Sequence, residues 1–391
     1  MRADDPARQL IPHREAVRDR GCRRAAPRGR VAVVILAGLF NSSCGPEETP
    51  RGPAVTGAFA DLFRLDTSIQ LEEDLADPIG DIAILAECRN GDLLVGDRIK
   101  FQIRRYAPDG RLLAIAGRYG AGPLEFRHVG GLVEIPSGRI LVTDPRLGRA
   151  TILTPDLRAD TVLRLRPAPR GSALAMGEAL LLTTVAGPRA TALTLFTPSW
   201  EPAWSIPAPS PGTMREFPYW DSYASVLADA TPDVALTAYS LRYPIYVHGR
   251  SGRLVDSIAS APASFRPAPV VSIGAFAGLD AHQRQDEWLA SFDVMSRLAI
   301  VNDSLLIVVH AVLRRTATSS AVAEDRRLDV YHLASRTRLA EDVALAPDER
   351  ILAGGRGLYL LAAQPPEPWI MQRLTYVGPS GRLGGRWGPA P

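Results

Sequence analysis

Most of the chain alternates short apolar runs with turns. From Ala58 onward, segments rich in Val, Ile, Leu, Thr and Tyr are separated by Gly, Pro, Asp and Ser, and long helical periodicity is nearly absent. Short runs of β-branched and aromatic residues bounded by turn residues are typical of strands. The pattern therefore predicts an all-β fold.

One type of turn recurs six times at a nearly regular interval. The turns are centred near Asp109, Asp156, Ser199, Ser251, Ser335 and Ser380, at intervals of 47, 43, 52, 84 and 45 residues. An inner hairpin precedes each turn, as in "RNGDLLVGD" and "PSGRILVTD", which makes about four strands a unit. A period of roughly 40 to 50 residues with several short strands is the signature of propeller blades. We predict a six-bladed β-propeller of four-stranded blades over 59–391.

The interval of 84 residues predicts an insertion in the fifth blade, at about 259–297. Its clearest helical segment runs from Leu279 to Leu298. The apolar residues of that segment are Trp288, Leu289, Phe292, Met295 and Leu298. Their spacing places them on one side of a helix. We expect the helix to pack on the propeller rather than bind a cofactor.

The segment 59–75 precedes the first full unit and alternates in strand fashion. An open propeller would leave unpaired strand edges on its first and last blades. We therefore predict that this segment pairs with the blade formed by the C-terminal segment and closes the ring.

Residues 1–43 have the parts of an export signal. "RRAAPRGR" is positively charged, Val31–Phe40 is a ten-residue apolar run too short to span a bilayer, and small residues precede Cys44. The arrangement resembles a bacterial lipoprotein signal, although Asn41 stands where leucine is usual. The resemblance implies lipidation of Cys44, a flexible tether over 44–58, and membrane contact through the lipid alone. An ordinary secretory peptide or an uncleaved anchor stays open.

Such a signal would place the protein in the periplasm or on the cell surface. Gly45 gives no inner-membrane retention signal of the aspartate type, which favours the outer membrane. Cysteine usage agrees with export. Cys22 would be lost with the signal, which leaves Cys88 without a disulfide partner, in the apolar run "DIAILAEC". A lone thiol there is usually a small buried hydrophobe, so we expect no catalysis by it.

The charge distribution argues against a nucleic-acid partner. The formal net charge is +3, but residues 1–43 hold nine arginines against four acids, so the remainder carries about −2. A surface that binds phosphates needs clustered positive charge. We expect a monomer whose ligand is a protein, a peptide or a glycan.

The stretch "GRYGAGPLEFRHVGGL", residues 117–132, allows two interpretations. Its glycines would let backbone N–H groups approach an anion, as in a phosphate cradle. A helix follows such a cradle, whereas the hairpin "LVEIPSGRILVTD" follows here. We therefore expect a connection between blades with Phe126 buried in it, and we name Arg118, Tyr119 and His128 as binding residues at the channel edge.

The same stretch and the hairpin after it match a known repeat pattern. The matching residues are Gly120, Gly122, Pro123, Glu125, Phe126, Val142, Asp144 and Arg149. Their order resembles the NHL repeat, with Leu124 in place of the usual glycine and Ala150 in place of an isoleucine. The resemblance implies a propeller related to the NHL-repeat and TolB-like superfamily, whose bacterial lipoprotein members mostly lack an assigned activity.

Asp97 and Asp144 recur at one position of two units, with Arg98 and Arg149 after them. An acid and an arginine could recognise a ligand together. Their recurrence favours the structural alternative, in which the carboxylate caps a turn and the arginine packs beside it.

Enzymatic alternatives need residues from several blades at the central channel. A zinc lyase of the amidating type needs histidines, and since His248 and His332 occupy outer-strand positions, only His128 and His310 could face the channel. A calcium-dependent lactonase needs inward oxygens. Its candidates are Asp81, Glu134, Asp233, Asn302 and Asp303. No G-x-S-x-G elbow of a serine hydrolase occurs.

Aromatic residues offer the remaining binding candidates. Phe217, Tyr219 and Trp220 lie in one loop, and Tyr239 and Tyr243 follow it. Exposed aromatic side chains anchor interfaces, although these could equally fill the spaces between blades. The sequence favours a binding or scaffold protein without a cofactor or metal. A periplasmic hydrolase or lyase with Ca²⁺ or Zn²⁺ in the channel stays open as the alternative.

Overall fold

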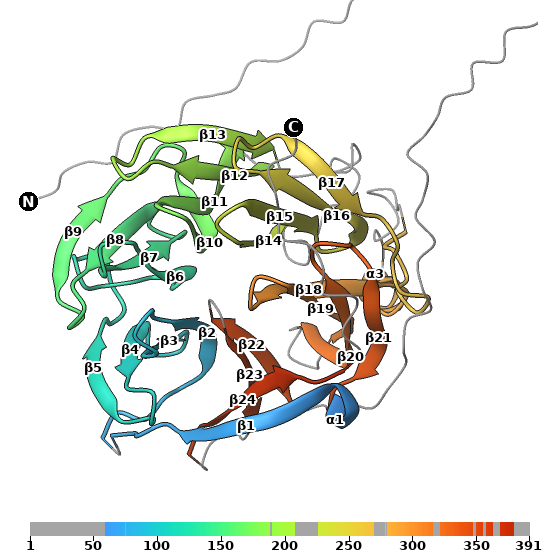
Figure 1. Cartoon of the computed structure of the whole chain (residues 1–391), viewed down its shortest axis with the longest axis horizontal. Coiled ribbons are helices and arrows are strands. Elements are labelled where there is room, and N and C mark those ends of the chain that lie inside the picture. Colours follow the sequence, from blue (N-terminus) through green and yellow to red (C-terminus); the bar gives the residue numbers. More distant parts are fainter. Residues whose placement is uncertain are drawn as a thin grey trace, which may run out of the picture. The chain divides into compact units, whose positions relative to one another are not determined.

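Five of the six recurring turns, all but the one near Ser380, join the third and fourth strands of successive sheets. The computed structural model describes residues 59–378 except 75, 188–189, 208–225, 270–277, 279, 316–320, 347–348, 355–356 and 363–367. These residues form six antiparallel sheets of four strands. Figure 1 shows the sheets side by side around a common centre. The chain is a six-bladed β-propeller, as the period of the turns predicted.

The first strand of each blade along the chain lies innermost, and the next three follow outward (Figure 1). The first blade is β2 (Ile82–Glu87), β3 (Leu93–Asp97), β4 (Gln102–Tyr106) and β5 (Leu112–Ala116). The second is β6 (Gly131–Glu134), β7 (Ile140–Asp144), β8 (Arg149–Leu153) and β9 (Ala159–Leu163). The third is β10 (Pro169–Met176), β11 (Ala179–Gly187), β12 (Ala190–Phe196) and β13 (Pro202–Pro207).

The other three blades repeat this order, with one exception at the ring closure. The fourth blade is β14 (Val226–Ala230), β15 (Val234–Tyr239), β16 (Arg242–Gly249) and β17 (Leu254–Ile258). The fifth is β18 (Asp293–Val301), β19 (Leu305–Arg315), β20 (Ala321–His332) and β21 (Arg338–Ala344). The sixth is β22 (Arg350–Gly354), β23 (Gly357–Ala362), β24 (Ile370–Tyr376) and β1 (Phe63–Gln70).

The N-terminal strand closes the ring. β1 follows the short helix α1 (Phe59–Leu62) and pairs antiparallel with β24, from Phe63 opposite Tyr376 to Gln70 opposite Ile370. The outermost strand of the sixth blade therefore comes from the other end of the chain, which confirms the prediction for this segment. Because the ring is closed, the first and last blades also pack against each other, and each blade has a neighbour on both sides.

Apolar side chains fill the spaces between neighbouring blades. Val95 of the first blade packs in one cluster with Leu352 and Tyr359 of the sixth. All residues of the second strands β3, β7 and β15 are buried, because these strands contact other blades on both faces. Each apolar side chain buried in this way contributes on the order of 1.5–3 kcal/mol, which a single isolated blade could not obtain.

The helix of the insertion is shorter than the sequence predicted. α3 covers Ala281–Leu289 and packs against β19, with Leu289 buried. Met295 and Leu298 belong instead to β18, the innermost strand of the fifth blade. The apolar residues that are spaced for one long helix belong to a short helix and to a strand that is buried on both faces. The second part forms a strand because it pairs with β19. No helix in the described part of the chain is long and apolar enough to cross a membrane.

Candidate functional site

The glycine-rich stretch 117–132 is the connection between β5 and β6, and the anion that it holds is its own Glu125. The Glu125 carboxylate accepts hydrogen bonds from the N–H of Gly122 (2.8 Å), the guanidinium of Arg118 (2.6 Å) and the N–H of Ala121 (2.9 Å). These donors lower the pKa of Glu125 to about 2, because each favours the charged form. The cradle is filled by the protein itself.

Arg149 holds the same loop from the neighbouring strand β8. Its guanidinium donates to the carbonyl oxygens of Ala121 (2.8 Å), Gly122 (2.5 Å) and Glu125 (2.7 Å). Phe126 is fully buried beneath the loop, as predicted. These contacts explain the motif: the glycines permit the sharp path, the acid and the arginine fix it, and the phenylalanine anchors it.

The two recurring aspartates cap turns, as their recurrence predicted. Asp97 is fully buried and accepts four backbone N–H bonds, among them those of Gly80 (2.6 Å) and Ile99 (2.9 Å). Asp144 accepts those of Arg127, Arg146 and Leu147 at 2.8–3.1 Å. In each case the carboxylate ties the turn after the second strand to the connection that enters the blade.

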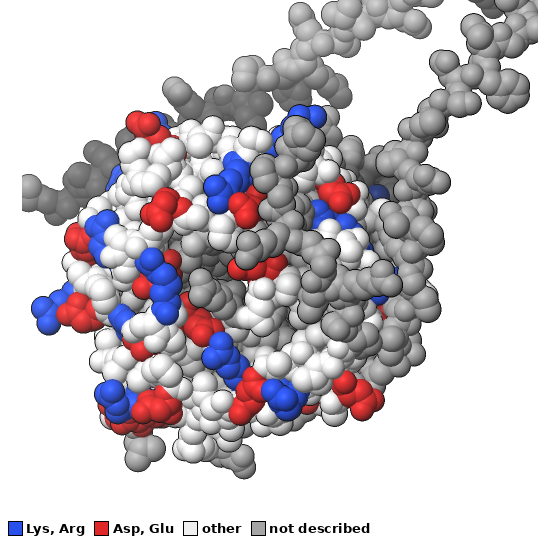
Figure 2. Space-filling model, in the orientation of Figure 1, with Lys and Arg blue, Asp and Glu red and all other residues white. Residues whose placement is uncertain are grey.

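The central channel is a cavity of about 820 Å³. Its walls come from the inner strands, and it reaches the turns that join first and second strands, where Asn90, Glu178 and Asp303 lie. The charged residues that line it are Glu87, Arg89, Glu134, Glu178, Asp229, Arg297, Asp303 and Arg373. Figure 2 likewise shows acidic and basic side chains interspersed on the face in view, without a continuous patch of either sign.

Two of the channel arginines are engaged by neighbouring acids. Arg89 lies 3.4 Å from Glu134, and its guanidinium also donates to two backbone carbonyls. Arg373 lies 3.3 Å from Glu87. These pairs link adjacent blades. The third arginine that lines the channel is Arg297.

Asp229 and Arg297 lie on neighbouring inner strands, β14 and β18. The Asp229 carboxylate accepts the N–H groups of Ile300 (2.6 Å) and Ala230 (2.8 Å), yet burial raises its pKa to about 7. Burial also lowers the pKa of Arg297, against the attraction of Asp229. Arg297 makes no hydrogen bond with any residue that the structure describes. Its guanidinium carries five N–H donors.

The predicted channel ligands are only partly brought together. Glu134, Asn302 and Asp303 line the channel, but Asp81 and Asp233 do not. Asp81 pairs with Arg350 (2.9 Å) and Asp233 with Arg250 (3.0 Å). These two acids stabilise turns and blade contacts, so they would not contribute to a calcium site in the channel.

The predicted loop residues also lie away from the channel. Arg118 bonds to Glu125, Tyr119 is 65% exposed and stands edge-on against Phe101 at 5.1 Å, and His128 is exposed. None of the three lines the channel cavity, because the loop folds back on itself instead.

The predicted aromatic anchors that the structure describes lie inside the propeller. Tyr239 is 6% exposed. The Tyr243 hydroxyl lies 3.3 Å from that of Tyr331, and burial raises the pKa of Tyr243 well above its ordinary value. Both tyrosines therefore fill space between strands, the alternative that the sequence left open. Phe217, Tyr219, Trp220 and Cys44 fall outside the described residues.

Cys88 is free and buried, as expected. Burial raises the pKa of its thiol to about 12. A thiol held in its protonated form is a poor nucleophile.

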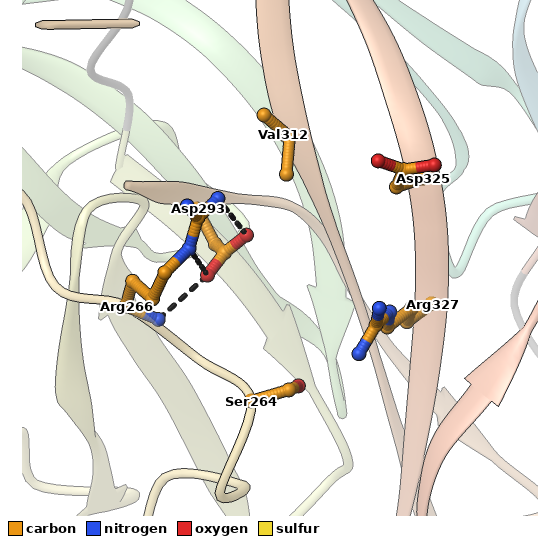
Figure 3. Close-up of a pocket in the computed structure, with 6 residues that line it drawn as sticks. All are labelled: Ser264, Arg266, Asp293, Val312, Asp325 and Arg327. Carbon is orange, nitrogen blue, oxygen red and sulfur yellow. Dashed lines mark hydrogen bonds and ion pairs between the residues drawn. The ribbon is translucent and has the colours of Figure 1, made fainter. Parts of the chain in front are cut away.

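A second pocket, of about 230 Å³, lies in the fifth blade (Figure 3). Its lining residues are Ser264, Arg266, Asp293, Val312, Asp325 and Arg327. Arg266 is fixed by Asp293 through its backbone N–H (2.6 Å) and its guanidinium (3.3 Å). Figure 3 shows Asp325 and Arg327 on the opposite side, from β20. The pocket is therefore polar and lined by both signs of charge.

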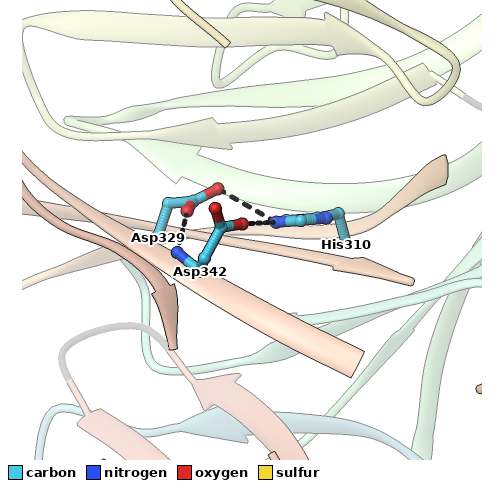
Figure 4. A group of neighbouring side chains, drawn as sticks. All are labelled: His310, Asp329 and Asp342. Atoms are coloured by element: carbon cyan, nitrogen blue, oxygen red, sulfur yellow. Dashed lines mark hydrogen bonds and ion pairs between the residues drawn. The ribbon is translucent and has the colours of Figure 1, made fainter. Parts of the chain in front are cut away.

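His310, Asp329 and Asp342 converge next to this pocket (Figure 4). Nε2 of His310 lies 3.3 Å from Oδ2 of Asp329 and 3.8 Å from Oδ1 of Asp342. Ser264 and Arg327, which line the pocket, both contact the Asp342 carboxylate. His310, which the sequence allowed to face the central channel, does not line it, because the strand β19 directs its side chain into the blade interior.

Comparison with known proteins identifies the fold and no more. A member of the DUF4221 family from Bacteroides vulgatus has a TM-score of 0.57 at 10% identity, over 82% of this chain and 100% of that one. A protein from Bacteroides fragilis described as exported has a TM-score of 0.54 at 10% identity, over 83% and 98%. No sequence-family model and no curated protein matches the chain, so the relationship to NHL repeats stays a prediction.

Sequence reasoning missed Asp229, Arg297, Asp329 and Asp342. Two of them carried a usable signal. Asp229 in "VLADA" and Asp329 in "RRLDVYHL" are acids inside otherwise apolar strands, where an acid is rarely buried unless it has a partner or a task. The partners could not be named, because they come from other strands.

Proposed function

We propose that this protein is an extracytoplasmic binding propeller whose central channel takes an extended peptide segment bearing a carboxylate. The observation that carries the proposal is Arg297, which lines the 820 Å³ channel without a hydrogen bond to any other described residue. A guanidinium pairs with a carboxylate through two parallel hydrogen bonds, which gives both affinity and orientation.

The inner strands supply the second part of the proposed recognition. β2, β6, β10, β14, β18 and β22 each stand at the edge of their sheet. An edge strand presents unpaired N–H and C=O groups, which an extended peptide can bind. The mixture of acids and arginines along the walls suits a partner that also carries both signs of charge.

The proposed location follows from the N-terminal segment. A signal over 1–43, a lipidated Cys44 and a tether over 44–58 would hold the propeller at the outer membrane, facing the periplasm or the cell surface. A monomer on such a tether can reach peptide segments of neighbouring envelope proteins. The similarity to an exported Bacteroides fragilis protein agrees with this location but rests on 10% identity.

We favour a binding role for the channel over the activity of a metal-dependent hydrolase or lyase. None of the channel-lining residues that the structure describes is a histidine. Glu134, one of the predicted metal ligands, already accepts the N–H of Arg89 at 2.7 Å. Glu87 and Asp229 are likewise engaged, by Arg373 and by backbone N–H groups.

The test is an affinity selection with a pool of random pentapeptides, read by mass spectrometry. The wild-type protein should retain peptides that share a carboxylate, and Arg297→Gln should weaken their binding roughly tenfold or more. Arg250→Gln is the matched control, because Arg250 pairs with Asp233 away from the channel.

A second variant tests whether the peptide binds inside the channel, without changing the charge of Arg297. Ala175 lines the channel on β10, and Ala175→Trp should block it without changing any ion pair. Retention of oligosaccharides but not of peptides would contradict the proposal. So would equal binding by the wild type and both channel variants, once thermal melting has shown that the variants are folded.

A further inference from the structure

We propose that His310, Asp329 and Asp342 bind a zinc ion in the fifth blade, with one coordination position open toward the 230 Å³ pocket. The three ligand atoms lie within 4.8 Å of one another. Ligands about 2.1 Å from a tetrahedral zinc ion stand roughly 3.4 Å apart. The two separations from His310 Nε2, 3.3 Å and 3.8 Å, are close to that value.

Two of the buried ligand atoms, Nε2 of His310 and Oδ2 of Asp329, lie 3.3 Å from each other but make no hydrogen bond with one another. His310 is 1% exposed and Asp329 is fully buried. Neither Nε2 of His310 nor Oδ2 of Asp329 makes a hydrogen bond within the part of the chain that the structure describes. Burial without a hydrogen bond costs a polar atom several kcal/mol on typical scales. A cation between these atoms would remove that cost.

The surroundings hold the third ligand in place. The strands β20 and β21 change register between Leu328 and Val330, and Asp342 has a positive φ of 57° there. Its N–H donates to Oδ1 of Asp329 (2.9 Å), and the Ser264 hydroxyl donates to its carboxylate. Bulges commonly redirect a side chain beside a site, and bonds from outside the ligand set orient the ligands.

The ligand set selects the metal. Imidazole nitrogen suits zinc and other transition metals, whereas calcium and magnesium take oxygen ligands. One histidine and two carboxylates give zinc a neutral site. Three protein ligands with a fourth position free are the arrangement of reactive rather than structural zinc sites. The open position would take an oxygen atom of a small polar compound, because the adjoining pocket is lined by side chains of both signs of charge.

One nearby cation competes with the metal. Nη1 of Arg327 lies 3.9 Å from Oδ1 of Asp342, and the Arg327 side chain is 42% exposed. This exposure lets the guanidinium turn into solvent when the metal binds. Replacing it should therefore strengthen zinc binding, an effect that a purely structural ion pair would not produce.

The test is calorimetric titration of untagged, chelator-treated full-length protein with ZnCl₂, and in parallel with MgCl₂ and CaCl₂. We expect one zinc ion per chain, and we expect Asp342→Asn to weaken its binding roughly a hundredfold. Arg327→Gln should strengthen it roughly fivefold. His332→Gln is the control, because His332 is a buried histidine of the same blade that bonds to Ser335 (2.8 Å).

Substitution of Co²⁺ for zinc adds a readout that does not depend on stability. A visible absorption band that appears in the wild type and in His332→Gln, but not in Asp342→Asn, supports the site. Asp342 is 22% exposed, so its variant is the one expected to fold without difficulty. Absence of saturable zinc binding, or equal affinity in the wild type and Asp342→Asn, would overturn the proposal and leave the group as an internal ion pair.

Discussion

Two carboxylates in this propeller each accept two backbone N–H groups, yet their pKa values are shifted in opposite directions. Glu125, in the loop between the first two blades, accepts two backbone N–H groups and a guanidinium, and its pKa is lowered to about 2. Asp229, on the channel wall, also accepts two backbone N–H groups and lies near an arginine, but its pKa is raised to about 7.

The difference comes from water. The Glu125 side chain is 26% exposed, and three donor groups stabilise its charged form. Asp229 is also half-buried, but at its place on the channel wall the cost of desolvation exceeds what its two N–H partners and the nearby Arg297 return. The two acids therefore differ in which effect is larger: hydrogen bonds for Glu125 and desolvation for Asp229. A group that titrates near neutral pH in a channel is of the kind found at functional sites.

Replacing the channel acid should produce the largest pH effect. The folded-state pKa of Asp229 lies above its ordinary value, so its contribution to stability is fully present below about pH 4 and is lost as the pH rises through 7. The wild type should lose up to about 4 kcal/mol over that window relative to Asp229→Asn. Urea unfolding at pH 4 to 8 measures the difference between the two curves.

The matched control for this prediction is Asp233→Asn in the same blade. Asp233 is 61% exposed and paired with Arg250, so its removal should leave the pH profile nearly unchanged. Parallel curves for the wild type and Asp229→Asn would show that solvent reaches the channel wall and that the comparison with Glu125 is wrong.

The fold could be predicted because each blade repeats the same local rules. Turn residues return at a steady interval, and apolar runs of strand length lie between them. The partners of Asp144 and Arg149 are backbone groups of the turn and of the connection between blades. These contacts therefore belong to the repeated motif itself. The pairing of β1 with β24 also followed, because a ring with open edges would be unstable.

The candidate sites could not be predicted because they depend on long-range register. His310 and Asp329 come from different strands, and Asp342 reaches them only through a shift in strand pairing and a positive φ. Arg297 faces the channel because Met295 and its neighbours form a strand rather than the predicted helix. A shift in strand register cannot be recognised from the spacing of apolar residues in a single sequence. Nor can that spacing alone show whether the residues around Met295 form a strand or a helix.

Breaking the support of the loop should have an intermediate effect. Arg149→Met keeps the length of the side chain and removes three hydrogen bonds to loop carbonyls. We expect a loss of about 2 kcal/mol, because water can replace part of these bonds. Arg158→Met is the control, since Arg158 is 82% exposed and pairs only with Asp156 across its own turn. Equal unfolding free energies for both variants would show that Arg149 does not hold the loop.

Replacing the loop acid should have the smallest effect and the opposite pH dependence. The lowered pKa of Glu125 means that its contribution is present above about pH 4.5 and is lost as the pH falls through 2. Glu125→Gln should therefore match the wild type near pH 2 and be less stable at pH 5. The exposed Glu201→Gln serves as control. If the wild type instead became more stable than Glu125→Gln as the pH fell, the loop N–H groups would not be stabilising the charged Glu125 carboxylate. They would then be available to an external anion.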